Sequence, residues 1–247
     1  GGPQRRSERE GSLAATPQVQ QMGLHADSLS KQYGPFTALD GVDLEVGSGE
    51  RVGLLGPNGS GKTTMLRILA GLNSPTTGEV TIDGEQYAPD AYGVRRKVGY
   101  VAHETMLYDN LTARENLAFH AELRGVPEDR IEAVLELVDL QHRASSLPRE
   151  FSHGMKKRLS LARAELDPPQ ILLMDEPFSG LDQFSTETVK ELLTDRTVLL
   201  VTHEFEVALD VCTRIVILDK GELVHDVPAE TVESLPALRE TYREVVR

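Results

Sequence analysis

The stretch that decides the fold is Gly56-Pro57-Asn58-Gly59-Ser60-Gly61-Lys62-Thr63-Thr64. It fits the pattern G-x-x-x-x-G-K-[ST] of a loop that binds nucleotide phosphates. An apolar strand is predicted just before it, at Val52 to Leu55, and a helical pattern begins at Lys62. Amide N–H groups of the loop and of the helix N-terminus therefore converge on one anion, and the glycines let the backbone approach it closely.

Two side chains of this loop have specific expected roles. Lys62 would reach the β- and γ-phosphates of ATP, and the Thr63 hydroxyl would bind Mg²⁺. The alternative is a glycine-rich turn before a buried helix. The flanking strand and helix favour the phosphate-binding role, so ATP and Mg²⁺ are the predicted cofactors.

A second apolar strand, Ile171 to Met174, ends in the carboxylates Asp175 and Glu176. An α/β fold places ligands at the carboxyl edge of its sheet, beside the phosphate loop. We expect Asp175 to hold Mg²⁺ through water. Glu176 would orient and polarise the attacking water, because adjacent residues on a strand point to different sides. Such an acidic pair is usually only a strand end, but the phosphate loop favours a catalytic role.

The order of elements predicts an α/β fold: a P-loop NTPase core with a mostly parallel sheet, an antiparallel β subdomain and a helical insert. Apolar alternation marks strands around a single helix up to about residue 84, and helical spacing marks residues 111 to 166. We expect a disordered tail (1–23), a single domain (24–226, with a core at 24–103 and 167–226 and a helical subdomain at 104–166) and a helical extension (227–247).

Composition excludes several classes of protein. The 247 residues include 26 Lys and Arg against 39 Asp and Glu, a net charge of -13, which disfavours a basic nucleic-acid binder. No run approaches the roughly 18 to 20 apolar residues of a membrane span. The lone Cys212 excludes an intramolecular disulfide and favours a reducing, cytoplasmic compartment.

Three further stretches follow in a characteristic order. They are Phe151-Ser152-His153-Gly154-Met155 with the helix after it, Ser179-Gly180-Leu181-Asp182, and Thr202-His203 after a strand. Together with the two nucleotide motifs, they resemble the ATP-binding subunit of an ABC transporter over Tyr33 to His203.

The resemblance implies further site residues. Ser152, His153, Gly154 and Met155 would form the signature that binds the γ-phosphate of ATP held by the opposite subunit, in trans. Ser152 and Gly154 lie at a predicted helix start, where anions are favoured. Asp182 would belong to the D-loop. His203 would contact the γ-phosphate or organise the water, and Tyr33 would stack on adenine.

The resemblance also implies partners. Two copies, or this chain and a different cassette, would enclose two ATP molecules. A separate integral membrane subunit at the cytoplasmic face of the cell membrane would contact the segment from His103 through the helical insert. Two alternatives remain: a non-transport ABC ATPase acting on ribosomes or DNA, and an unrelated P-loop kinase or GTPase. The acidic composition disfavours the first alternative, and the second would leave the stretch at Phe151 to Met155 unexplained.

This sequence departs from the family pattern at three positions. His103, eight residues before Leu111, stands where the family has the Q-loop glutamine, so we assign it both catalytic and metal-binding roles. His153 replaces a glycine of the signature and Met155 a glutamine, which puts in question how closely the backbone approaches phosphate there.

We expect ATP turnover to fall when His103 becomes protonated, because a neutral imidazole can replace an amide near Mg²⁺ whereas a cation repels the metal. The pH–rate profile of His103→Gln tests this. The variant should keep its activity below neutrality, and a profile identical to that of the unsubstituted chain would contradict the expectation.

One subgroup is suggested by Ala102-His103-Glu104 and by the residues from Tyr108 to Leu117. They are similar to the haem-exporter ATPases of cytochrome c maturation, although Glu104 stands where that subgroup has glutamine. Haem export is therefore the expected transport function. A small multidrug or antibiotic exporter ATPase is the alternative.

Overall fold

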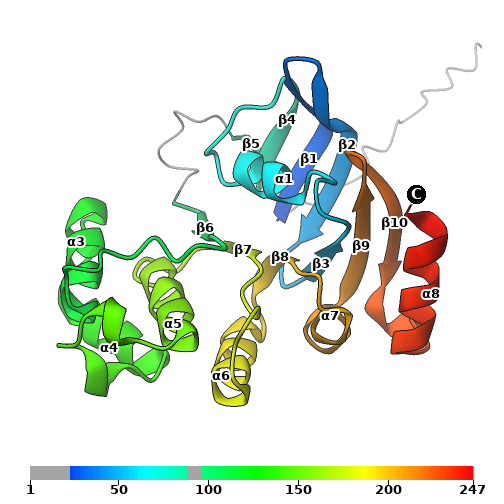
Figure 1. The fold of residues 1–247 in the computed structure, drawn as a ribbon. Helices are drawn as coiled ribbons and strands as arrows, with labels where there is room; N and C mark the ends of the chain where they lie inside the picture. The colour runs from blue at the N-terminus through cyan, green and yellow to red at the C-terminus, as the bar shows by residue number, and fades with distance from the viewer. Residues whose placement is uncertain (1–22, 88–95, 247) are drawn as a thin grey trace, which may run out of the picture.

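A computed structural model describes residues 23–87 and 96–246. Apart from Gly23, the expected tail over 1–23 lies outside the described residues. The centre of the molecule is a six-stranded sheet in the order β10-β9-β3-β8-β7-β6 (Figure 1). Its strands are β3 (Arg51–Leu55), β6 (Val98–Val101), β7 (Ile171–Asp175), β8 (Thr197–Val201), β9 (Arg214–Asp219) and β10 (Glu222–Pro228).

Five of these strands run parallel, and β10 pairs antiparallel with β9. Strands β7 and β8 are buried along their whole length. Continuous apolar runs are what a parallel strand needs when both faces of the sheet are covered. The predicted mostly parallel sheet is confirmed, and β3, which delivers the phosphate loop, lies at its centre between β8 and β9.

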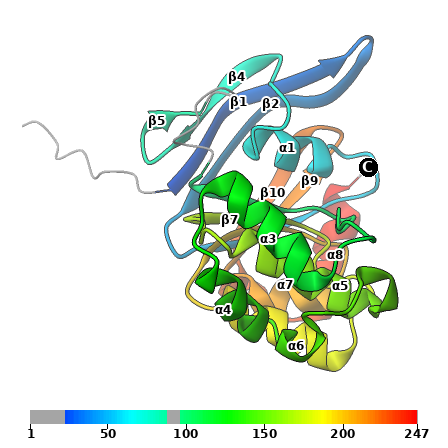
Figure 2. The same cartoon turned by 90° about the vertical axis from the view of Figure 1, so that its left-hand side faces the viewer.

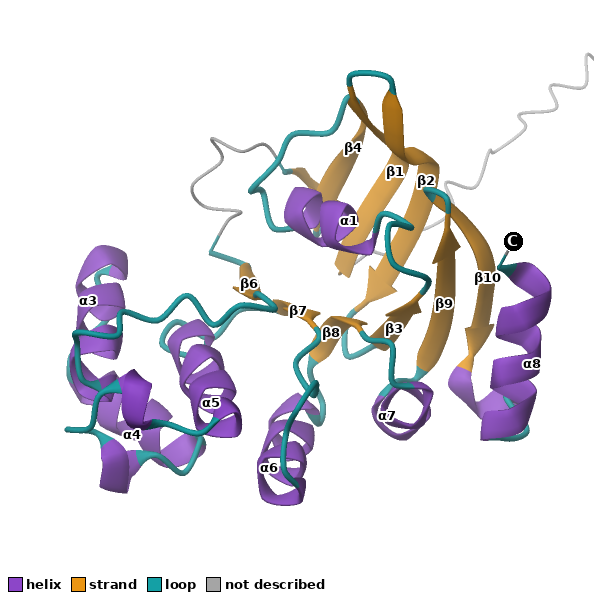
Figure 3. Ribbon diagram, viewed as in Figure 1, coloured by secondary structure: helices purple, strands orange, loops and turns teal. Residues whose placement is uncertain are grey.

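A second, antiparallel sheet has the order β2-β1-β4-β5. Its strands are β1 (Gly23–Tyr33), β2 (Phe36–Gly47), β4 (Thr77–Ile82) and β5 (Glu85–Gln86). Alternate residues Val42, Leu44 and Val46 are buried, as the period of two predicts. Helix α1 (Lys62–Leu69) lies between the two sheets (Figure 3), where its residues join both sheets in one apolar core.

The helical insert forms a separate lobe of α3 (Ala113–Arg124), α4 (Asp129–Leu137) and α5 (His153–Ala164), which faces the viewer in Figure 2. A capping box starts α3, in which Thr112 and Glu115 bond to each other's backbone N–H. The lobe has its own core, with Leu117, Ile131 and Leu159 at its centre. The helical spacing of α3 is confirmed, but Leu117 is buried while Leu123 is 61% exposed.

The face of the large sheet opposite α1 is covered by α6 (Gln183–Leu193), α7 (Phe205–Val211) and α8 (Leu235–Val245) (Figure 1). Three short 3₁₀ turns complete the described elements (Gln141–Arg143, Pro148–Glu150, Ala229–Thr231). Over the described ranges, 23–87 and 96–246, no helix has the length and apolar character to cross a membrane. The predicted α/β class, with its antiparallel sheet and helical insert, is confirmed.

Candidate nucleotide-binding site

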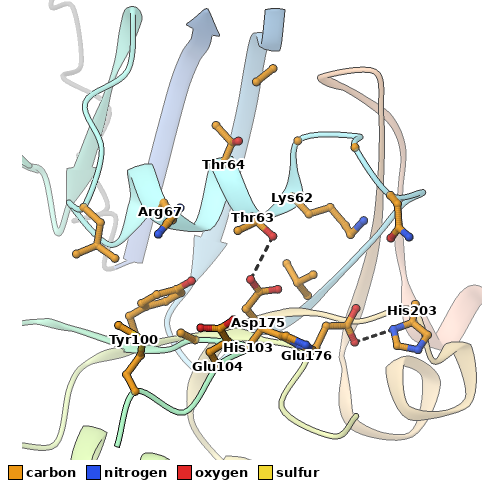
Figure 4. A pocket seen from close by; sticks show the side chains of 18 of the residues that line it. Lys62, Thr63, Thr64, Arg67, Tyr100, His103, Glu104, Asp175, Glu176 and His203 are labelled. Carbon is orange, nitrogen blue, oxygen red and sulfur yellow. Dashed lines mark hydrogen bonds and ion pairs between the residues drawn. The ribbon is translucent and has the colours of Figure 1, made fainter. Parts of the chain in front are cut away.

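A cavity of about 850 Å³ opens beside the phosphate loop (Figure 4). The loop and α1 form one wall, with Lys62 and Thr63 among its residues. Asp175 and Glu176, at the end of β7, and His203, after β8, line the opposite wall with the segment that follows β6. The carboxyl ends of three parallel strands thus deliver the predicted catalytic residues to one place, as the topology of a parallel sheet requires.

Glycine is required at two positions of the loop. Gly56 has φ 153° and Gly61 has φ 109°, both in the region that side chains rarely adopt. A Cβ at Gly56 would lie 2.2 Å from the carbonyl oxygen of Leu218, and one at Gly61 would lie 2.4 Å from that of Ala38. The loop therefore passes between β9 and β2 with no room for a side chain at either position.

The tight turn between β9 and β10 supports the loop from behind. Its central residues, Lys220 and Gly221, have φ 48° and 85°, as a two-residue hairpin turn needs. Gly221 N–H donates to the Ser60 carbonyl at 2.9 Å, and its own carbonyl accepts from Asp40 N–H at 2.9 Å. The phosphate loop is therefore held to the sheet before a nucleotide binds.

The ammonium of Lys62 folds back over the loop. It donates to the carbonyl oxygens of Gly56 at 2.7 Å and Pro57 at 2.8 Å. Burial lowers the pKa of Lys62, and the carboxylates of Glu176 and Asp175 oppose this shift. The side chain lies in the cavity wall as a positive charge among backbone dipoles, where a phosphate oxygen would be a stronger acceptor.

The two predicted Mg²⁺ ligands face each other across the cavity. Thr63 Oγ1 donates to Asp175 Oδ2 at 3.2 Å. Burial raises the pKa of Asp175, and the hydrogen bond from Thr63 opposes the rise. A hydroxyl and a carboxylate oxygen suit Mg²⁺, which binds through few protein oxygens and keeps water and phosphate as its other ligands. Among the described residues there is no group of three or more His, Cys, Asp or Glu that could hold a metal ion.

The predicted catalytic pair, Glu176 and His203, is brought together. Glu176 Oε2 lies 2.9 Å from His203 Nδ1, and the side chain of His203 is 66% exposed. The contact is an ion pair when His203 is protonated, and Glu176 Oε2 is buried without a hydrogen-bond partner among the described residues. Glu176 has φ 51°, which is uncommon outside glycine, and its N–H donates to the Val201 carbonyl at 2.9 Å. This arrangement can hold a carboxylate in place as a general base.

His103 and Glu104 also line the cavity, close to Asp175 in Figure 4. The charge on His103 is near enough to influence the Asp175 carboxyl. The backbone carbonyl of His103 accepts from Lys157 Nζ at 2.7 Å. The structure therefore brings His103 close to Asp175, one of the two predicted Mg²⁺ ligands. The catalytic and metal-binding roles of His103 stay predictions.

The structure does not bring Tyr33 into the cavity lining. Its hydroxyl accepts from Asn73 Nδ2 at 3.2 Å, and Lys31 Nζ lies 5.1 Å from its ring centre. Phe36, three residues later and 57% exposed, lines the cavity instead. Base stacking by Tyr33 stays a prediction that the position of Phe36 does not favour.

The four signature residues lie at the start of α5, and none of them lines the cavity. Ser152 caps the helix by accepting from Met155 N–H at 3.2 Å, and His153 Nε2 lies 3.1 Å from the Ser179 carbonyl. A Cβ at Gly154 would lie 2.5 Å from Ser185 Oγ, so this glycine is required for packing on α6. A role in another subunit's site is compatible with this placement.

Asp182 begins the neighbouring helix. Its carboxylate accepts from Ser185 N–H at 2.7 Å and thereby caps α6. This backbone bond lowers the pKa of Asp182. The predicted D-loop thus connects Glu176, the predicted general base, to a helix that packs against Gly154 of the predicted signature.

Several residues of the site were not found from the sequence. Phe36, Arg67, Tyr100 and Arg163 line the cavity. Lys157 is 3% exposed and reaches the carbonyls of His103 and Glu176. No local motif indicates these positions, because each depends on packing between distant segments.

Comparison with known proteins agrees with this geometry. Residues 39–179 match the family described as ABC transporter. The chain is 40% identical over 231 residues to the sulfate/thiosulfate import ATP-binding protein CysA of Bradyrhizobium diazoefficiens, covering 87% of this chain and 67% of that protein. The CysA of Synechocystis is 38% identical, with 87% and 63% covered. The chain therefore spans about two thirds of the length of these bacterial relatives.

A shorter relative, the probable sulfate/thiosulfate import protein CysA of Chlorella vulgaris, is 35% identical, with 87% of this chain and 95% of that protein covered. All three names concern import. They do not support the haem-exporter subgroup, which was suggested by a few residues around His103 that a distantly related cassette can share.

Solved structures give the same family. A dimeric bacterial ABC transporter cassette matches with a TM-score of 0.75 and 30% identity, covering 83% of this chain and 98% of that one. The ATP-binding subunit of an ABC transporter matches with a TM-score of 0.81 and 31% identity, covering 91% and 99%. The chain therefore belongs to the ABC transporter family, as one of its ATPase cassettes.

Proposed function

We propose that this chain powers the import of an inorganic sulfur oxyanion, of the sulfate or thiosulfate type, by binding and hydrolysing ATP beside a separate membrane subunit. The proposed substrate class is supported by the 40% identity to a sulfate/thiosulfate import protein over 87% of this chain. The ATPase role is supported by the site itself, where Lys62, Thr63, Asp175, Glu176 and His203 surround one cavity.

In this proposal each residue has a defined task. The loop amides and Lys62 bind the ATP phosphates, and Glu176, which lies beside His203, takes a proton from the attacking water. Mg²⁺, held by Thr63 and Asp175, would neutralise phosphate charge. Two cassettes would close on two ATP molecules and open after hydrolysis. Each ATP site would be completed by Ser152 of the other cassette. A matching dimeric cassette was solved with ADP and Pi in a post-hydrolysis state.

The membrane subunit would dock on an exposed apolar surface formed by Met106, Tyr108, Phe119 and Leu123, which are 40% to 66% exposed. Tyr108 and Phe119 stack edge to face, with ring centres 5.2 Å apart. Met106 belongs both to this surface and to the cavity lining. A loop of the membrane subunit seated here, at the cytoplasmic face of the membrane, would therefore contact the segment that lines the nucleotide cavity.

Uptake of radiolabelled sulfate tests the substrate class. Cells that lack this chain should take up sulfate more slowly, and the intact chain should restore uptake whereas Glu176→Gln should not. Normal sulfate uptake in cells without the chain would rule out this cargo. ATP hydrolysis by the purified chain is a separate measurement and tests the enzyme alone.

We expect Phe36→Ala to weaken ATP binding about 10-fold, because stacking of a base on an aromatic ring contributes roughly 1–3 kcal/mol. Tyr33→Ala is the matched control and should leave the affinity unchanged. Titration with a fluorescent ATP analogue measures both. If Tyr33→Ala is the variant that loses affinity, the base lies on the ring that the sequence indicated.

A further inference from the structure

Lys157 is a charged side chain buried inside the protein. It lies in the second turn of α5 and is 3% exposed, although lysine is rarely buried without partners. Its Nζ donates to the carbonyl of His103 at 2.7 Å and to that of Glu176 at 3.1 Å. Burial lowers the pKa of Lys157, and the carboxylates of Asp175 and Glu176 oppose this shift. One ammonium thus joins three separate parts of the chain.

The bond to Glu176 acts on the residue whose carboxylate, in the proposed function, takes the proton from the attacking water. The Glu176 N–H is held by the Val201 carbonyl at 2.9 Å, and the Glu176 carbonyl is held by Lys157. Its φ of 51° is a conformation that a residue with a side chain adopts only when its surroundings hold it there. Bonds on both sides of the Glu176 Cα therefore fix the direction in which the side chain leaves the backbone.

The bond to His103 connects the same ammonium to the second wall of the cavity. The segment after β6 that carries His103 also carries Met106, whose carbonyl accepts from Arg163 Nη1 at 2.8 Å. Lys157 and Arg163 both belong to α5. A shift of α5 must therefore move this segment and the Glu176 backbone together, or break these bonds.

Helix α5 is also the helix that begins with the signature. Ser152 caps it, and Lys157 follows five residues later, roughly 7.5 Å along the axis. The helix packs on both neighbouring cores, with Leu159 in the core of the helical lobe and Leu161 in that of the large sheet. A force on Ser152 therefore reaches Lys157 through a rigid helix of fewer than two turns.

We propose that Lys157 is a positioning residue that makes hydrolysis in one subunit depend on that subunit's contact with the ATP of its partner. This rests on the proposed function, since it takes Ser152 to bind the partner's γ-phosphate. When Ser152 is engaged, α5 is held where Lys157 bonds to both carbonyls, and the Glu176 carboxylate faces its water. Without the ammonium, two subunits still close on ATP but the carboxylate is not held in place.

The test is Lys157→Met, which keeps the length of the side chain and removes its donors. Steady-state hydrolysis, ATP titration and gel filtration with ATP are measured on the full chain. We expect kcat to fall roughly 30- to 100-fold, the scale of a misplaced catalytic group. The dissociation constant for ATP should change less than about 3-fold. Lys157→Met should itself elute as an ATP-dependent dimer, because slow hydrolysis leaves the two subunits closed on ATP for longer.

Two variants serve as controls. Lys156→Met removes the neighbouring charge on the same helix and should behave as the unsubstituted chain. Lys157→Arg keeps a charged donor and should recover kcat to within about 5-fold. If Lys157→Met gives no cooperative thermal unfolding, Lys157→Gln replaces it, since the amide keeps a polar group at the buried position and should show the same pattern with a smaller loss.

The results separate the two proposals. A kcat within 2-fold of the unsubstituted chain, or loss of ATP binding and dimerisation together with turnover, overturns the role of Lys157. An unsubstituted chain that hydrolyses no ATP, together with a Glu176→Gln variant that forms no dimer, overturns the proposed function and the inference with it.

Discussion

Replacing Glu176 by glutamine should lower kcat for ATP hydrolysis about 100- to 1000-fold and leave ATP affinity nearly unchanged. A positioned general base contributes roughly 10²- to 10⁴-fold, and an amide cannot accept the proton. The side chain keeps its size and its place 2.9 Å from His203 Nδ1. Phosphate release under saturating ATP measures the rate, and a fluorescent nucleotide measures the affinity.

The partner His203 supplies a control for this result. His203→Ala should lower kcat by less than Glu176→Gln does, because His203 is 66% exposed and lies beside the base without replacing it. The double variant should be no slower than Glu176→Gln alone, since residues that act as a unit are not additive. Losses that multiply in the double variant would mean that the two residues act separately.

Replacing Lys62 by methionine should weaken ATP binding about 100-fold. Hydrogen bonds to charged groups are each worth roughly 1.5–3 kcal/mol, and the ammonium is the loop's only side chain with a full positive charge. In the free protein it bonds to the carbonyls of Gly56 and Pro57 instead, so its removal should cost little stability. Isothermal titration with ATP and Mg²⁺ gives the affinity, and thermal unfolding gives the stability.

Lys220→Met is the matched control for Lys62→Met. Lys220 lies in the hairpin turn behind the loop, with φ 48°, and its side chain does not line the cavity. Its replacement removes the same charge from the same neighbourhood and should change ATP affinity less than 2-fold. A similar loss in both variants would show that ATP responds to the general field of the loop rather than to a bond from Lys62.

The nucleotide loop could be predicted because its chemistry is contiguous. Nine adjacent residues contain the glycines, the lysine and the threonine, and the strand and helix that place them lie on either side in sequence. Asp175 and Glu176 could be predicted because a parallel sheet brings its carboxyl ends together. The pairing of Glu176 with His203 follows from β7 and β8 being neighbours.

The other residues depend on packing between segments that are distant in sequence. Whether Tyr33 or Phe36 faces the base depends on how the turn between β1 and β2 meets α1. The bonds of Lys157 could not be predicted, because they depend on α5 lying against β6, where backbone carbonyls replace water. Gly154 has its clearest contact with Ser185, a residue that the signature pattern does not include.

The pairing of β3 also determines when the chain can first bind ATP during its synthesis. The phosphate loop follows β3, but β3 is bonded to β8 and β9, more than 140 residues later. The loop is held by Gly221, in the turn after β9. A nascent chain that has exposed its entire nucleotide motif therefore still lacks the strands and the turn that shape it. Nucleotide therefore cannot stabilise this fold on the ribosome until the residues through Gly221 have emerged, because the loop lacks its supporting bond before then.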